Sequence, residues 1–256
     1  MRFIIFAVII GIVVYFLKKR NKPTGTKVVM QDDATHELLL NNVSFYTKLS
    51  QAQQQTFLKR VQQFLNTVTI SGTRNVEPSP LDRVYVAASA IIPIFHFTDW
   101  RYNNINEVLL YNDAFDHDYN TTAEGRNIAG MVGTGAMNRM MILSVKALRA
   151  GFEHNGAHNT GIHEFVHLLD KADGAVDGVP DYMIPKEMVT PWMRYMHQEI
   201  NDIREGDSDI NPYAGTNEAE FFAVLSEYFF QKPELLEEHH PELYRIMNAI
   251  YNPVVK

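Results

Sequence analysis

The stretch GIHEFVHLLD, residues 161–170, is the strongest structural signal in this chain. His163 and His167 are four residues apart, which places both imidazoles on one face of an α-helix, one turn apart. Two neutral imidazoles at this separation can occupy two of the four positions around a zinc ion. Glu164 lies about 100° further around the helix, from where its carboxylate can reach a water molecule on such an ion. The stretch therefore predicts an amphipathic helix whose polar face carries a metal site.

This histidine spacing also has a simpler explanation. The chain has 10 histidines among 256 residues, so an HExxH pattern would arise by chance in about 2 or 3 such chains per hundred. The pattern alone therefore leaves open a surface helix with an ordinary histidine pair. A third ligand elsewhere in the chain would favour the metal site.

The best source of a third ligand is a second predicted helix, NEAEFFAVLSEYFF, residues 217–230. Glu220 and Glu227 are seven residues apart and share one face of this helix. The helix also carries a broad apolar surface that should pack on the 161–170 helix: Phe221, Phe222, Leu225 and Phe229. Acidic side chains beside such a surface are unfavourable unless they are paired or bind a metal. The alternative is a solvated acidic face in which Glu218 and Glu220 interact with the helix N-terminus, and spacing alone does not decide between the two.

Length and composition limit the class of protein. A chain of 256 residues forms one large domain or two small ones with ample core. The absence of cysteine excludes disulfides, thiolate zinc sites and cysteine nucleophiles. Six of the 23 basic residues precede Asp32, the first of the 30 acidic residues, so residues 28–256 have 17 basic side chains and a net charge of −13. This net negative charge of residues 28–256 argues against nucleic-acid binding.

An unbroken apolar run, FIIFAVIIGIVVYFL, occupies residues 3–17. As a helix it would span about 22 Å, less than the roughly 30 Å hydrocarbon core of a bilayer, and the flanking Arg2 and Lys18 could close the gap by reaching toward the interfaces. We expect a single-pass membrane anchor over residues 1–20, followed by a linker over 21–35. A cleaved signal peptide and a buried core helix are the alternatives. A basic cluster directly after the run, with no small-residue cleavage site, argues against the signal peptide.

The charges around this run also predict its orientation. Four basic residues follow the run, at positions 18, 19, 20 and 22, whereas only Arg2 precedes it. The positive-inside rule then places the C-terminal body in the cytoplasm.

The rest of the chain is expected to mix short strands with helices, with no internal repeat and no second domain after residue 40. The predicted strands lie at residues 67–71, 108–111 and 140–145, and the last is our candidate for an edge strand that binds substrate. The further predicted helices lie at residues 50–66, 81–95, 190–205 and 241–251. Residues 116–135 are expected to form a loop or an irregular hairpin, and residues 170–180 a series of turns.

Two long segments resemble a known family. HEFVHLLD at residues 163–170 and YAGTNEAEFFAVLSEYFF at residues 213–230 resemble the Mlc titration factor A family of bacterial zinc metallopeptidases. The second segment is also similar to the metal-binding helix of the anthrax lethal factor protease domain, where a tyrosine lies seven residues before the ligand glutamate.

The resemblance implies a role for individual residues. The implied zinc ligands are His163, His167 and Glu220. Glu164 would be the general base, and the hydroxyl of Tyr213 would stabilise the tetrahedral intermediate. Asp170 and Glu227 match recurrent acidic positions that orient the ligand imidazoles and raise their basicity. The alternatives are a plain turn for Tyr213, which follows Pro212, and helix-end acids or simple salt bridges for the two carboxylates.

The remaining histidines carry no partner pattern. We expect His154 and His158, in a Gly/Asn loop, to face solvent, although one of them could line a substrate cleft. The others are expected to be structural or surface residues: His36, His96, His117, His197, His239 and His240.

The combined expectation is an α+β, zincin-like metallopeptidase domain over residues 36–256. A small mixed sheet packs against helices, and the metal lies between the 161–170 and 217–230 helices. The resemblance implies an aminopeptidase-like zinc peptidase that acts on a peptide or protein substrate, with a regulatory role through a partner such as a transcriptional regulator.

The alternative is a membrane-tethered, zinc-containing binding protein that sequesters a regulator without turnover. Three protein ligands leave a coordination position for water, which favours the enzyme, since a closed structural site would need a fourth. The apolar run at residues 3–17 is a departure from soluble family members and puts their cytosolic partners in doubt for this chain.

Overall fold

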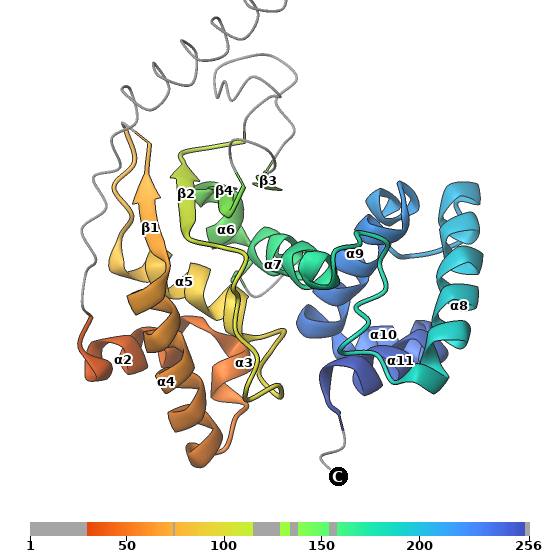
Figure 1. Ribbon diagram of the computed structural model, residues 1–256, viewed down its shortest axis with the longest axis horizontal. Coiled ribbons are helices and arrows are strands. Elements are labelled where there is room, and N and C mark those ends of the chain that lie inside the picture. The colour runs from red at the N-terminus through yellow and green to blue at the C-terminus, as the bar shows by residue number, and fades with distance from the viewer. Residues whose placement is uncertain (1–29, 74, 115–128, 134–137, 154–157, 254–256) are drawn as a thin grey trace, which may run out of the picture.

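The computed structural model describes residues 30–73, 75–114, 129–133, 138–153 and 158–253 (Figure 1). The expected membrane anchor at residues 1–20 and most of the expected linker lie outside these ranges. Within them, no helix combines the length and the apolar character needed to cross a membrane. Anchor and orientation therefore stay predictions.

The centre of the N-terminal half is a four-stranded mixed sheet with the order β1-β2-β4-β3. Its strands are β1 (Thr69–Gly72), β2 (Glu107–Tyr111), β3 (Gly130–Val132) and β4 (Met140–Ser144). The first two and β4 are parallel, and β3 is antiparallel to β4. The expected α+β class with a small mixed sheet is confirmed.

The structure corrects the predicted edge of this sheet. β4 pairs with β2 on one side and β3 on the other, so the strand predicted at residues 140–145 is internal. The edge on this side of the sheet is β3, which lies in the segment expected to be a loop or irregular hairpin. A three-residue strand that begins with glycine has no alternating pattern by which it could be found in the sequence.

Four helices precede or follow β1 and build the core on one side of the sheet: α2 (Asp32–Asn42), α3 (Ser44–Thr47), α4 (Gln51–Thr67) and α5 (Pro80–Ile91). Serine starts two of them, because Ser50 and Ser79 each form a reciprocal capping box with the residue three positions on. The predicted helices at 50–66 and 81–95 are confirmed, although the second ends at Ile91. α2 begins at Asp32, inside the expected linker. Its Thr35 and Leu39 are buried, so this helix is part of the folded domain.

From Val145 onward, the described residues form helices and connecting turns. The helices are α6 (Val145–Ala150), α7 (Thr160–Asp170), η2 (Lys171–Asp173), α8 (Lys186–Glu205), η3 (Pro212–Gly215), α9 (Glu218–Gln231), α10 (Pro233–His239) and α11 (Pro241–Tyr251). The helices predicted at 217–230 and 241–251 are confirmed. α8 begins four residues earlier than predicted, with Pro191 inside its second turn rather than at its start. A proline there removes only one helical hydrogen bond, which the packing of buried Trp192 on Phe221 and Phe222 can offset.

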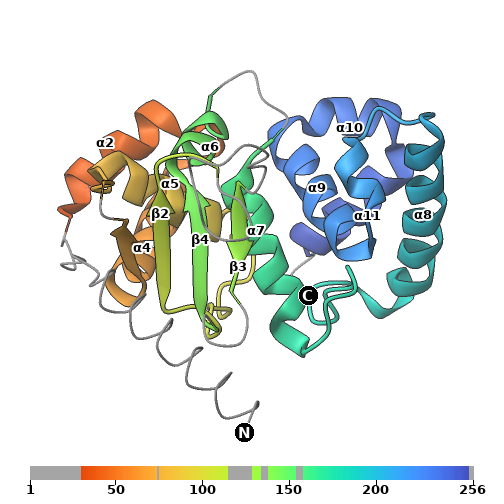
Figure 2. The ribbon, with the colours of Figure 1, turned by 90° about the horizontal axis from the view of Figure 1, so that it is seen from above.

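Helix α7 joins the two halves (Figure 2). It runs beside the edge strand β3 on one side and packs against α9 on the other. Phe165 contacts the rings of Phe64 and Tyr102 in the N-terminal core. Phe221, Phe222 and Leu225 on α9 are fully buried, as their apolar pattern predicted. The polar faces of α7 and α9 therefore meet at a fixed distance, because the apolar faces of both helices belong to one continuous core.

Candidate metal centre

The start of α7 is held in place by one asparagine. Asn159 accepts a hydrogen bond from the Ile162 amide at 3.0 Å and donates one to the Gly151 carbonyl at 2.9 Å. Two residues on, a Cβ at Gly161 would lie 2.2 Å from the Ser89 hydroxyl oxygen, so only glycine lets α7 approach α5 so closely. The register of the next turn, which carries the histidines, is thereby fixed.

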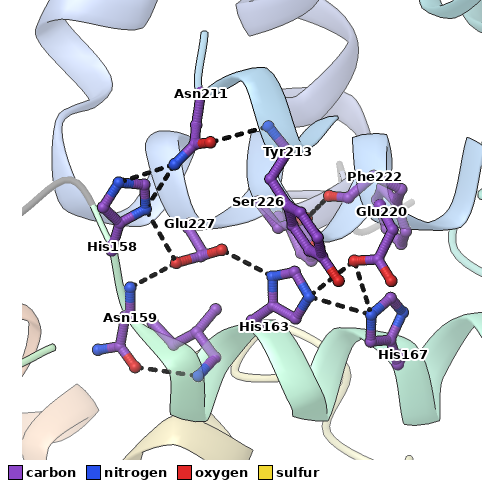
Figure 3. Close-up of polar contacts among 12 residues, drawn as sticks. His158, Asn159, His163, His167, Asn211, Tyr213, Glu220, Phe222, Ser226 and Glu227 are labelled. Carbon is purple, nitrogen blue, oxygen red and sulfur yellow. Dashed lines mark hydrogen bonds and ion pairs between the residues drawn. The ribbon is translucent and has the colours of Figure 1, made fainter. Parts of the chain in front are cut away.

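Three donor atoms from α7 and α9 converge on one point (Figure 3). His163 Nε2 lies 3.0 Å from Glu220 Oε2 and 3.1 Å from His167 Nε2. The third side of the triangle, from His167 Nε2 to Glu220 Oε2, is 3.3 Å. Asn217 fixes Glu220 by accepting a hydrogen bond from its backbone N–H at 2.9 Å. The structure therefore brings the three predicted ligands together as a possible metal site.

The pKa values of Glu220 and His163 favour the binding of a cation between these side chains. Burial raises the pKa of Glu220, but hydrogen bonds with His163 and His167 outweigh it and bring the value to about 2. Burial lowers the pKa of His163, whereas hydrogen bonds to Glu220 and Glu227 raise it to about 10 overall. In the metal-free protein, a proton on His163 thus supplies the positive charge that the Glu220 and Glu227 carboxylates stabilise. A metal ion would replace that proton.

Glu227 holds the other side of the His163 ring. Its Oε1 lies 2.7 Å from His163 Nδ1, and its Oε2 accepts the Asn159 backbone N–H at 2.5 Å. Burial raises the Glu227 pKa, but the nearby imidazole of His158 and the hydrogen bond with His163 outweigh it and keep the pKa below its usual value. An ionised acceptor at Nδ1 keeps a proton on that nitrogen, so when the Nε2 proton is replaced, the Nε2 lone pair is directed at the triangle. This is the geometry expected of a carboxylate that orients a ligand imidazole.

Asp170 has a different environment from the expected one. Its carboxylate is 1% exposed and accepts the Gly178 backbone N–H at 3.0 Å, and its other oxygen has no partner among the described residues. Burial raises its pKa to about 6. Gly178 has a φ of +72°, and its carbonyl accepts the Trp192 indole N–H at 2.7 Å. Asp170 therefore ties the turn after α7 to α8, and its expected role at a ligand imidazole stays a prediction.

Glu164 points from α7 toward the edge strand. It is 5% exposed, and burial raises the pKa of its carboxyl group, although His163 and His167 oppose that shift. A Cβ atom built on Gly130 of β3 would meet this side chain. A buried carboxylate with a raised pKa beside a triangle of metal-binding atoms has the properties of a general base.

Tyr213 lies on η3, above the triangle (Figure 3). Asn211 caps this short helix by accepting the Tyr213 backbone N–H at 2.9 Å. The Tyr213 ring is 54% exposed, and its centroid lies 6.0 Å from that of His163. Burial raises the pKa of its hydroxyl, and the negative charges of Glu220 and Glu164 add to that. Tyr213 therefore keeps its proton and can donate it in a hydrogen bond at the open side of the site.

Sequence reasoning did not assign a role to His158, which the structure places between two site elements. Asn211 Nδ2 lies 2.9 Å from His158 Nε2, and His158 Nδ1 lies 3.8 Å from a Glu227 oxygen. The imidazole thus bridges the loop before α7 to η3 (Figure 3). The only signal in the sequence is its place next to Asn159, the N-cap. His154 lies outside the described residues.

Comparisons with known proteins agree with this geometry. A family model described as glucose-regulated metallo-peptidase M90 matches residues 17–252. A protein called Mlc titration factor A from Pectobacterium atrosepticum is 29% identical over 226 residues, covering 82% of this chain and 83% of its own length. Its namesake from Yersinia pestis is 28% identical over 251 residues, covering 92% and 88%. An uncharacterized protein from Synechocystis is 29% identical over 227 residues, covering 84% and 82%. Since the family model spans the sheet, both metal-site helices and the C-terminal helices, this chain belongs to the M90 family of metallopeptidases.

Proposed function

We propose that this protein is a zinc-dependent peptidase. The observation that carries the proposal is the convergence of His163, His167 and Glu220 on one point beside the buried carboxyl group of Glu164. Membership of a metallopeptidase family supports it. The proposed ligands and Glu164 all come from the two helices that the sequence singled out.

The donor set fits zinc in both chemistry and spacing. Nitrogen and oxygen ligands about 2.0–2.2 Å from zinc, at tetrahedral angles, lie roughly 3.3–3.6 Å from one another. The three ligand atoms here lie 3.0–3.3 Å apart, close to that spacing. Two imidazoles and one carboxylate leave a fourth position open, as in catalytic zinc sites.

The protein's own groups supply the proton transfers. When bound, zinc would act as a Lewis acid that polarises the peptide carbonyl and makes water more acidic. Glu164 would accept a proton from the attacking water and later deliver it to the leaving amine. The Tyr213 hydroxyl would donate a hydrogen bond to the oxyanion that develops on the carbonyl. Glu227 would keep the His163 ring oriented throughout.

The substrate would be an extended peptide lying along β3, the edge of the sheet nearest to Glu164. We further propose aminopeptidase-like specificity, which is supported only by the resemblance of the sequence to its family. The test is a panel that contains both amino-acid anilides and internally quenched peptides. Cleavage of the anilides supports an aminopeptidase, and cleavage of the internal peptides alone contradicts it.

The general-base assignment has its own test on the same panel. Glu164→Gln keeps the volume of the side chain but cannot accept a proton at neutral pH. This change should lower kcat by roughly 10²–10⁴-fold and leave bound zinc at the wild-type level. A wild-type protein that holds zinc, cleaves nothing in the panel and is indistinguishable from Glu164→Gln would contradict the peptidase.

The names of two relatives favour a second candidate function. Both are called Mlc titration factor A, a name that describes the titration of something called Mlc. On this alternative the chain binds a transcriptional regulator and sequesters it without turnover. Capture of such a partner by wild type and Glu164→Gln alike, with no hydrolysis by either, would support it.

We also propose that residues 1–20 anchor the protein in a membrane, with the body in the cytoplasm. The full-length chain should then sediment with membranes, resist extraction by salt and be released by deletion of residues 1–20. Digestion of the body by a protease added to intact cells would contradict the orientation, and a mature chain starting after residue 20 would contradict the anchor.

A further inference from the structure

The side chain of Glu164 is packed against the backbone of the edge strand. A Cβ atom built on Gly130 would lie 2.6 Å from both Cγ and Oε1 of Glu164, and 2.9 Å from its Cδ. Nonbonded carbon atoms normally approach to about 3.5–4.0 Å. Any side chain at position 130 would therefore occupy space that Glu164 now fills.

The strand cannot move away to relieve such a contact. Gly130 lies opposite Leu143 of β4, and the hydrogen bonds on either side hold β3 in place. The Ser144 N–H donates to the Ala129 carbonyl at 2.8 Å, and the Gly133 N–H donates to the Met140 carbonyl at 2.8 Å. Because β4 is itself internal, a shift of β3 would break this ladder or carry the sheet with it.

The helix is equally constrained. The neighbours of Glu164 on the apolar side of α7, Ile162 and Phe165, are 1% and 0% exposed, and Asn159 caps the helix. With both backbones held, the part that can yield is the Glu164 side chain. The contact involves Cγ as well as the carboxylate, so rotating the carboxylate alone would not relieve it. Glu164 would have to adopt another rotamer, which moves its oxygens away from the metal site.

We propose that Gly130 is a positioning residue for Glu164. Because Gly130 has no side chain, the edge strand leaves room for the rotamer in which the Glu164 carboxylate acts as the base. This inference rests on the proposed function, in which Glu164 is the general base. It also accounts for a glycine inside a strand, where glycine is otherwise unfavourable. Glycine is needed at position 130 because Glu164 approaches so closely and not because of the backbone conformation, since Gly130 has no positive φ.

The contact is tested first by thermal unfolding, which needs neither zinc nor substrate. Gly130→Ala should lower the unfolding midpoint of the full-length protein. In a Glu164→Ala background the same change should not lower it, because Cγ, Cδ and Oε1 are gone. A Gly130→Ala protein that fails to fold must therefore be rescued by Glu164→Ala. Equal destabilisation in both backgrounds, or none in either, would overturn the inference.

The catalytic consequence is measured on the best substrate from the panel. Gly130→Ala should retain one zinc per chain and lower kcat by roughly 10²-fold, with little change in KM, as expected for misplacement by about 1 Å. The control is Thr69→Ala on β1, the strand at the opposite edge of the sheet from β3. Its kcat should stay within about threefold of wild type.

The outcomes separate this inference from the proposed function. A normal kcat for Gly130→Ala beside an active wild type would overturn the positioning role and leave the peptidase intact. A raised KM with normal kcat would also overturn it, because Gly130 would then act on the peptide and not on Glu164. An inactive wild type would contradict the peptidase, and the thermal unfolding of the two backgrounds would still decide whether Gly130 positions Glu164.

Discussion

Among the described residues of the C-terminal half, two clusters combine histidines with a shared carboxylate, and one of them has the geometry of a metal site. In the first, Glu220 offers one oxygen to two imidazole nitrogens that also approach each other. In the second, Asp209 uses both oxygens. Its Oδ2 lies 2.7 Å from His239 Nδ1, and its Oδ1 lies 2.6 Å from His240 Nε2.

The two clusters differ in whether each imidazole has its own hydrogen-bond acceptor. Tyr228 also donates to Asp209 Oδ2 at 2.8 Å, and the other nitrogen of His240 lies 3.4 Å from Glu199. Each imidazole of the second cluster thus has an acceptor of its own, and no shared point remains for an ion. In the first cluster three donor atoms share one point. Composition alone would not separate the two, whereas the convergence of atoms does.

The largest expected effect is that of removing the metal. A chelator should abolish peptide hydrolysis, because zinc would polarise the substrate, and added zinc should restore it. The unfolding midpoint should also fall on chelation, since an ion that binds only the folded state stabilises it. Full hydrolysis in the presence of excess chelator, with zinc shown to be absent, would contradict the metal site.

Tyr213→Phe should have the next largest effect. It removes only the hydroxyl that would stabilise the developing oxyanion, so kcat should fall roughly 10²–10³-fold while KM changes little. Zinc content should stay at the wild-type level because the ring remains. A loss expressed mainly in KM would assign Tyr213 to substrate binding instead.

Glu227→Gln should weaken zinc binding by roughly 10–100-fold, as found when a carboxylate that orients a ligand imidazole is replaced. The amide can still accept from His163 Nδ1 but carries no negative charge to raise the basicity of the ring. Competition with a chromophoric chelator measures the change. The same substitution at Glu199, which contacts His240 and Ser208, is the matched control and should leave zinc affinity unchanged.

The smallest effect is expected at the second cluster. Burial raises the pKa of Asp209, but hydrogen bonds with His240, His239 and Tyr228 outweigh it and bring it to about 2. Hydrogen bonding to Glu199 is the largest cause that raises the pKa of His240. Asp209→Asn should therefore lower the free energy of unfolding by about 1 kcal/mol near pH 6, a modest value because Asp209 is partly exposed.

The sign of the pH dependence follows from these two shifts. The raised His240 pKa gives stability that is complete below its unfolded value and is lost as pH rises through the folded value. The depressed Asp209 pKa gives stability that is present above its unfolded value and is lost as pH falls toward about 2. The destabilisation by Asp209→Asn should thus be largest at pH 5–6 and shrink above neutrality, measured by denaturant unfolding. A penalty that does not vary with pH would contradict this ionic pairing.

The regular parts of the fold could be predicted from the sequence because they follow strong local patterns. The helical spacing of apolar and polar residues predicted α4, α7, α9 and α11, and the motif spacing predicted which side chains meet. What could not be predicted depends on tertiary pairing. β3 is three residues long and exists through its ladder with β4.

Side-chain partners show the same limit. The sequence treated Asp170 and Glu227 alike, yet Glu227 reaches His163, while Asp170 faces the Gly178 backbone. That distinction depends on how the turn after α7 folds back, with Gly178 so close to α9 that a Cβ would lie 2.3 Å from the Glu218 carbonyl oxygen. Contacts between segments far apart in the chain leave no local pattern to read.

The most direct test of the account is the zinc content of three full-length proteins, measured after dialysis against a zinc buffer. We predict one zinc per chain in wild type, none held stoichiometrically in Glu220→Ala, and one in Asp209→Asn. Together these values would place the ion at the converging triangle and not at the second cluster. Full zinc occupancy in Glu220→Ala, or its loss in Asp209→Asn, would contradict that assignment.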